Sequence, residues 1–113
     1  MQIANTDTNV QASGADEVKE PTWLVVTDEG ATITLSTKKS FNGVVQDRLT
    51  LTSPTVKLVR ACQKQAGNDD SLLDDMLFSS LASVGLADIQ SLTVKDYNRV
   101  QRGYFRMVEE DGI

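Results

Sequence analysis

The sequence Leu49-Thr-Leu-Thr-Ser-Pro-Thr-Val56 divides this chain into two parts with different periods. Up to Pro54, apolar and polar residues alternate, which is the period of a strand with one buried face. Proline has no amide hydrogen to donate to a strand ladder, so Pro54 ends the strand. Beyond it, the apolar residues recur at the 3.6-residue period of a helix. The junction therefore predicts an α+β fold in which strands come first and helices follow.

Three strands are expected on the N-terminal side of this junction. Residues 23–27 are rich in strand-forming types, and residues 31–36 alternate between apolar and polar side chains. Asn42-Gly43 is the strongest short-range signal for a hairpin turn. The third strand, over 45–52, alternates correctly if a small irregularity near Asp47 is allowed. We expect a three-stranded antiparallel β-meander with one face covered by about three helices.

Two of these helices follow the junction directly, and each begins at a residue that can cap it. Either Ser53 or Thr55 can cap the first helix, which closes at Gly67. One of residues 69–71 caps the second helix, which runs to about Val84.

A short helical turn over 86–92 leads to a third helix over about 94–109. Thr93 and Asp96 have the spacing of a capping box, in which the carboxylate returns to the N-cap amide. The predicted core draws on the strands and on all three helices. It comprises Trp23, Leu35, Leu51, Val59, Leu77, Leu81 and Val100.

Length and charge limit what this chain can be. Its 113 residues have room for a single α+β domain, expected over 22–110. Residues 1–21 are polar, acidic and poor in bulky apolar groups, so we expect a flexible tail there. The net charge is −5, and eleven scattered basic residues are outnumbered by sixteen acids. Because a duplex-binding face needs clustered Lys and Arg, nucleic-acid binding is not expected.

The distribution of apolar residues and cysteine predicts a cytoplasmic protein. No segment approaches the ~20 apolar residues that a membrane span requires, so no membrane partner is expected. No signal peptide is evident at the start of the sequence. Cys62 is the single cysteine and fits a reducing compartment.

The sequence carries no pattern that predicts catalysis, a cofactor or a metal. It has no histidine, which is the commonest base or metal ligand near neutral pH. It has no phosphate-binding glycine motif and no nucleophile elbow. Cys62 fits a small core residue. Four aspartates at 69, 70, 74 and 75 lack the spacing of a calcium loop. We expect the first two to cap a helix and the last two to face solvent.

Apolar residues beyond the needs of the core indicate where a partner could bind. The main stripe of the second helix would use residues 72, 73, 76, 77, 81 and 84, which leaves Phe78 outside it. Tyr104, Phe105 and Met107 are too close together for one helical face to bury all three. We therefore expect Phe78, Tyr104 and Phe105 to contact a partner or a second copy. The alternative is that these side chains pack on the meander or on segment 86–92.

Several short words of this sequence resemble one protein family. They are the junction Leu-Thr-Leu-x-x-Pro-Thr-Val at 49–56, the helix end at 61–67, Leu77-Phe78 with Leu81-Ala82, and Lys95-Asp96-Tyr97-Asn98 with Gln101. Over about residues 32–104, the chain is similar to the small tail assembly chaperones of contractile-tailed, Mu-like bacteriophages and prophages.

The resemblance implies a non-catalytic viral protein that acts in the host cell cytoplasm. Such proteins are described as acidic factors that coat the long, helical tape measure protein and keep it soluble until tail tube subunits replace them. The tape measure protein is therefore the expected partner, and the tail tube protein is a further candidate. A homo-oligomer through the second or third helix is also open. The alternative function is a structural tail or neck component retained in the phage particle. A small enzyme or nucleic-acid factor is a third reading.

Overall fold

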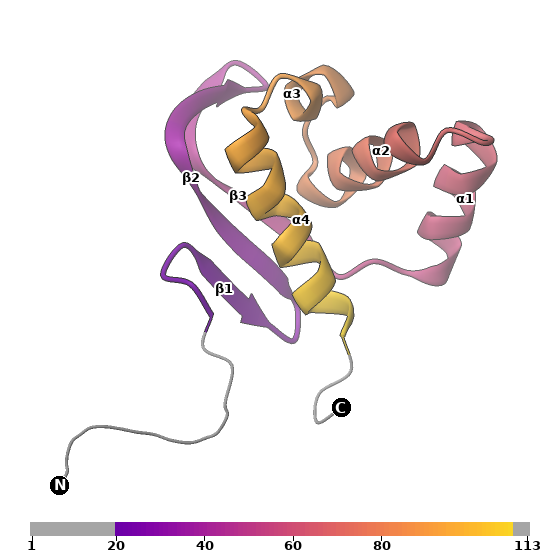
Figure 1. Ribbon diagram of the computed structural model, residues 1–113, viewed down its shortest axis with the longest axis horizontal. Helices are drawn as coiled ribbons and strands as arrows, with labels where there is room; N and C mark the ends of the chain where they lie inside the picture. The colour runs from indigo at the N-terminus through magenta and orange to yellow at the C-terminus, as the bar shows by residue number, and fades with distance from the viewer. Residues whose placement is uncertain (1–19, 110–113) are drawn as a thin grey trace, which may run out of the picture.

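The computed structural model describes residues 20–109. Three strands are followed by four helices, as Figure 1 shows. In chain order they are β1 (Leu24–Thr27), β2 (Gly30–Phe41), β3 (Val44–Thr52), α1 (Val56–Ala66), α2 (Asp70–Ala82), α3 (Leu86–Gln90) and α4 (Val94–Val108). The predicted α+β class and three-stranded meander are confirmed, and the turn expected over 86–92 contains α3. The tail predicted over 1–21 lies almost entirely outside the described residues, so it stays a prediction.

The strands form one antiparallel sheet in the order β1-β2-β3. Asn42 and Gly43 make the turn between β2 and β3, with φ of 54° and 81°. These left-handed conformations are the ones that a tight two-residue hairpin requires. β2 continues past its predicted end at residue 36 as far as Phe41. Most of its second half is exposed, so no alternation of apolar side chains marks it in the sequence.

A large irregularity interrupts the pairing of β2 with β3. Thr34 pairs with Arg48 and Lys39 pairs with Gln46, so residues 35–38 stand opposite Asp47 alone. The irregularity predicted near Asp47 is confirmed, and the additional residues lie on β2. Such a bulge removes backbone groups from the ladder, and buried ones must find other partners.

Side chains of α4 provide two of those partners. The buried Asp96 carboxylate accepts a hydrogen bond from the Ser36 amide at 2.8 Å, and Arg99 Nη1 donates one to the Thr34 carbonyl oxygen at 2.8 Å. Thr93 caps α4 by accepting from the Asp96 amide. The capping box is therefore only half formed, because the Asp96 carboxylate turns to the sheet and not to the N-cap. The bulge and α4 hold each other in place.

α4 crosses the sheet over β1 and β2 (Figure 1). Gly103 allows the close approach, since a Cβ there would lie 3.0 Å from Ile33 Cδ1 and 3.4 Å from Leu24 Cδ1. α2 contacts β3 beside it. Together α2 and α4 cover the apolar face of the sheet, whose buried residues include Leu24, Ala31, Ile33, Leu35, Leu49 and Leu51.

α1 and α2 form a helical hairpin, with α1 on the outer side of α2 (Figure 1). The structure selects Thr55 and Asp69 as the caps. Thr55 Oγ1 accepts from the Leu58 amide at 3.1 Å, and Asp69 Oδ1 accepts from the Leu72 amide at 3.0 Å. None of the helices within residues 20–109 is long and apolar enough to cross a membrane.

The predicted core is largely confirmed. The buried members are Leu35, Leu51, Leu77, Leu81 and Val100. Trp23 and Val59 are only partly buried, so their placement in the core is wrong in part. Trp23 precedes β1 at the margin of the sheet, where the guanidinium of Arg99 lies 5.1 Å from its ring centroid. Val59 belongs to the outer helix α1, which has neighbours on fewer sides.

Candidate partner-binding surface

The structure places the three predicted contact residues in three different environments. Phe78 is 2% exposed, Tyr104 is partly buried and Phe105 is 57% exposed. The expectation that Phe78 lies outside the core is therefore wrong. Its ring centroid is 5.6 Å from that of Tyr104 and 5.7 Å from that of Tyr97. Phe78 joins α2 to α4, and the folded chain offers no surface there to a partner.

This error arises because α2 has neighbours around most of its circumference. Residues 72, 73 and 76, which were expected in the core stripe, are only partly buried, whereas Leu77, Phe78 and Leu81 are buried. α2 contacts α1, α3 and β3, and the Phe78 ring contacts two tyrosines of α4. A helix enclosed in this way is apolar on several faces. A single stripe assigned from periodicity misses the side that faces α4.

Tyr104 and Phe105 extend this aromatic cluster to the surface. Their ring centroids are 5.7 Å apart at an interplanar angle of 71°, which is an edge-to-face contact. Burial, with the charge of Asp74 as a second cause, raises the pKa of the Tyr104 phenol above its ordinary value. The phenol is therefore neutral at physiological pH, and the cluster meets solvent as an uncharged aromatic surface.

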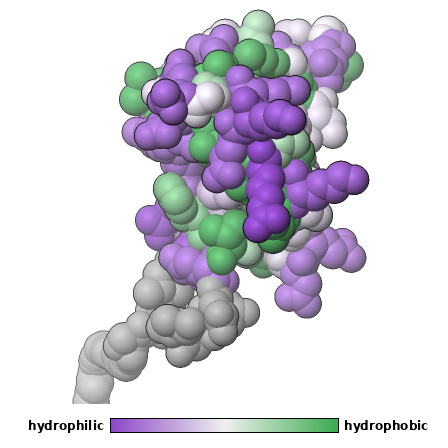
Figure 2. Space-filling view, turned by 90° about the vertical axis from the view of Figure 1, so that its right-hand side faces the viewer, coloured by the Kyte–Doolittle hydropathy of each residue, from purple (hydrophilic) through white to green (hydrophobic). Residues whose placement is uncertain are grey.

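An apolar groove lies between the start of α1 and the last turn of α4. Its volume is about 290 Å³, and its apolar lining comprises Pro54, Val56, Val59, Tyr104 and Val108, joined by Thr55, Arg60 and Gln63. Val56 is 66% exposed and Val108 is 47% exposed. Figure 2 faces the α1 side of the molecule and shows apolar side chains exposed among polar ones toward the lower end of this face.

Sequence reasoning missed Val56 and Val108 as surface residues. Both lie near helix ends and share a helical face with buried or partly buried neighbours, so periodicity alone assigns them to the interior. Only the packing shows that no element within residues 20–109 covers this face where α1 begins and α4 ends. Val56 begins α1, the first helix of the chain, and Val108 ends α4, the last one. A local sequence pattern does not show that these two helix ends line one groove.

The α2–α4 contact also contains a polar network. The Tyr97 hydroxyl donates to Asp75 Oδ1 at 2.8 Å, and Gln90 Nε2 donates to Asp75 Oδ2 at 3.2 Å. Burial, followed by the bond to Asp75, raises the pKa of Tyr97 well above its ordinary value. Burial and the neighbouring charges of Asp75 and Asp70 raise the pKa of Asp74. The expectation that Asp75 only faces solvent is wrong, because its carboxylate joins α2, α3 and α4.

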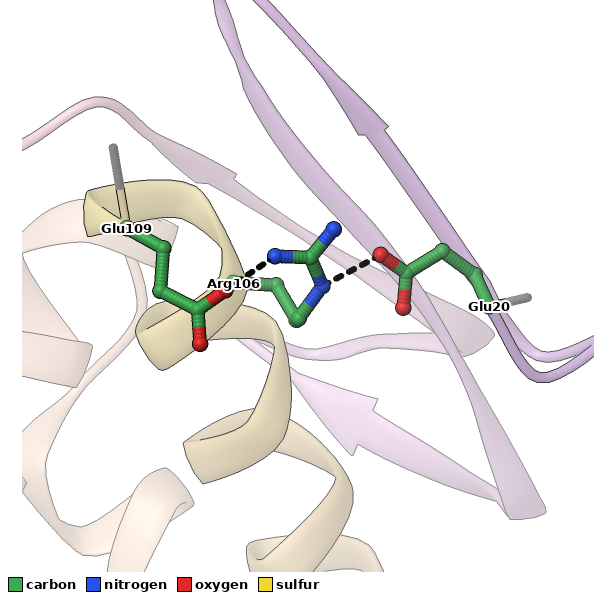
Figure 3. A network of polar contacts seen from close by, with 3 residues as sticks. All are labelled: Glu20, Arg106 and Glu109. Carbon is green, nitrogen blue, oxygen red and sulfur yellow. Dashed lines mark hydrogen bonds and ion pairs between the residues drawn. The ribbon is translucent and has the colours of Figure 1, made fainter. Parts of the chain in front are cut away.

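Arg106 lies on the side of α4 opposite Tyr104, since the two residues are about 200° apart around the helix. Its guanidinium forms ion pairs with Glu20 and Glu109, as Figure 3 shows. The Glu20 carboxylate is the main cause that raises the pKa of Arg106. These contacts join the beginning of the described chain to the end of α4.

The described part of the chain provides contact area without a cluster of metal-binding groups. No group of three or more His, Cys, Asp or Glu side chains in residues 20–109 is arranged so that it could hold a metal ion. Cys62 is buried and unpaired with any other cysteine. The groove and Phe105 therefore offer a partner mainly apolar contact.

Residues 32–109 match the family described as "Phage tail assembly chaperone proteins, E, or 41 or 14". The chain belongs to this family. No curated protein and no solved structure matches it significantly. The match runs from β2 to Glu109, so the bulge, the groove and all four helices of this phage tail assembly chaperone lie within the family region.

Proposed function

We propose that this phage tail assembly chaperone binds the tape measure protein in the host cell cytoplasm and keeps it soluble during tail assembly. Membership of the family supports a chaperone role in building the phage tail. The short words described above point to contractile-tailed, Mu-like phages and prophages as the source. The chaperone acts by contact alone and transforms no molecule.

The observation that carries this proposal is the exposed apolar surface at the α1–α4 end. Val56, Phe105 and Val108 are all about half exposed or more, and Tyr104 lies between them. A long helical client that aggregates does so through apolar side chains in water. A chaperone that covers those side chains needs apolar groups that its own core leaves outside.

Charge and mass action fit the same role. A net charge of −5 keeps the chaperone, and a client that it coats, in solution. Binding to the soluble form of the client stabilises that form in proportion to the free chaperone concentration. We therefore expect several copies to act on one long client.

Co-expression with the tape measure protein tests the proposal. We expect the wild-type chain to increase the soluble fraction of the tape measure protein, and the double variant Phe105→Ser and Val108→Ser to lose most of this effect. Val25→Ser with Val44→Ser is the matched control, because both valines are similarly exposed on the sheet. Equal solubility of the client with and without the wild-type chain would contradict the proposal.

Mass spectrometry of purified mature particles separates a chaperone from a retained tail or neck component. A chaperone leaves before the tail is complete, so mature particles should not contain its peptides in a fixed ratio to the tail proteins. A constant number of copies per mature particle would show instead that the chain is a structural component.

A further inference from the structure

The exposed side of α4 carries a repeat that the fold does not use. Its members, which we call the seam, are Val94, Asn98, Gln101, Phe105 and Val108. Their successive spacings of four, three, four and three residues are those of a helix that packs along a second helix. Val94 is 77% exposed and Phe105 is 57% exposed. Within residues 20–109, the side chains of Asn98 and Gln101 make no hydrogen bond.

Two of the four basic side chains of α4 form no ion pair or hydrogen bond within residues 20–109. Arg99 bonds the Thr34 carbonyl oxygen, and Arg106 bonds two carboxylates. Lys95 and Arg102 are exposed, and neither forms an ion pair with any residue from 20 to 109. Each directly follows a seam residue, in the flanking position where charge determines the partner of a paired helix. Glu109, which follows Val108, has the same position but is already paired with Arg106.

The charge on this side of the seam favours some binding partners over others. The chain as a whole is acidic, yet the two residues flanking the seam that form no ion pair within residues 20–109 are both cations. In a second copy packed antiparallel about Gln101, Arg102 would face the partner's Arg102, and like charges disfavour that pairing. A helix with acidic residues beside its apolar stripe would instead pair with Lys95 and Arg102.

We propose that the seam of α4 docks an amphipathic helix of the tape measure protein whose apolar stripe is flanked by Asp or Glu residues; this rests on the proposed function. Phe105 and Val108 contact the apolar stripe at one end, and Val94 contacts it at the other. Asn98 lies between the apolar ends of the seam, where a polar residue fixes the register of paired helices. The groove beside Val108 then receives a side chain from the end of the docked helix.

Two synthetic peptides test the chemistry of the seam. Both are about 21 residues long, three heptads with Leu at the seam positions, and they carry either Glu or Lys at the flanking positions. Fluorescence anisotropy with the full chain should show that the Glu peptide binds about tenfold more tightly or better, and that salt reduces the difference. The variant Lys95→Glu with Arg102→Glu should reverse the preference.

Matched variants separate this effect from overall charge and from folding. Arg48→Glu with Lys64→Glu makes the same change in net charge at exposed positions outside the seam, and it should keep the preference for the Glu peptide. Phe105→Asp should weaken binding of the Glu peptide, while circular dichroism confirms an intact fold. Equal affinity for both peptides, or no binding of either, would overturn the inference.

The outcomes also distinguish this inference from the proposed function. If the charge-reversed variant still keeps the tape measure protein as soluble as the wild type does, the seam is not its docking site, although the chaperone role stands. If the wild type fails to solubilise the tape measure protein, the proposed function and the identity of the docked helix both fail. A dimer in sedimentation that Phe105→Asp converts to a monomer would assign the seam to a second copy and overturn the inference.

Discussion

At the scale of single residues, we expect Phe78 to affect stability and Phe105 to affect partner binding. Phe78→Ala removes a buried ring between α2 and α4, and we expect a loss of about 3–5 kcal/mol in the free energy of unfolding. Phe105→Ala removes an exposed ring whose edge-to-face contact with Tyr104 contributes about 1 kcal/mol. Urea titration of both variants measures the two costs. Similar losses would show that Phe78 is not a core residue.

Asp74 makes the stability of the fold depend on pH. Because its pKa is raised in the folded state, its contribution is complete below the ordinary value of 3.8 and is lost as pH rises through the raised pKa. Asp74→Asn should therefore raise the melting temperature at pH 7, and the gain should vanish below pH 3.8. Thermal unfolding across this range measures it. An equal gain in melting temperature at pH 7 and below pH 3.8 would contradict the prediction.

The Asp96 side chain helps to hold the bulge of the sheet in place. Asp96→Ala leaves the Ser36 amide in the bulge without its acceptor, which should cost about 1–3 kcal/mol. Asp96→Asn keeps one acceptor oxygen and should cost less. Hydrogen exchange at the Ser36 amide reports the bond directly, and unchanged protection in Asp96→Ala would show that the carboxylate does not hold the bulge.

At the scale of elements, α1 has few neighbours. It packs chiefly on α2, whereas α4 contacts both β1 and β2. Thr55→Ala removes the side-chain cap of α1 and should cost about 1 kcal/mol. Amides of α1 should then exchange faster while those of α4 keep their protection. Faster exchange in both helices together would show that they open as one unit.

The difference between local and long-range contacts explains which elements the sequence could predict. The junction at Pro54 and the caps at Thr55 and Thr93 depend on residues within one helical turn, so local patterns reveal them. The length of β2 and the burial of Phe78 depend on distant elements, and local periodicity does not contain them. Asp96, for example, bonds a residue 60 positions away, although its spacing from Thr93 predicts a cap.

The candidate site likewise contains one part that local sequence patterns reveal and another that they do not. Phe105 stands out as an apolar residue in excess on α4, and the sequence identifies it correctly as lying outside the core. The groove unites Val56 with Val108, from α1 and α4, and no local pattern relates them. The family resemblance predicted the class of function because it depends on short sequence motifs that are spread over most of the chain.

At the scale of the whole molecule, charge controls association. The net charge is −5 at pH 7 and the isoelectric point is about 4.5. With repulsion gone near pH 4.5, exposed groups such as Phe105 and Val94 should bring copies together. Light scattering against pH measures this, and Phe105→Ser should reduce the increase. A scattering intensity that does not change from pH 7 to pH 4.5 would contradict it.

Glu20 and Glu109 share one guanidinium, so both limits of the described chain reach the same corner of the molecule. A short linker between them would permit circular permutation, with new termini opened at Gly43, where the hairpin tip has open space around it. Any fusion joined after Glu109 emerges next to Val108 and would crowd the docking region. A fluorescent reporter for client capture therefore belongs at the hairpin tip, away from the C-terminal end of α4 (Figure 1).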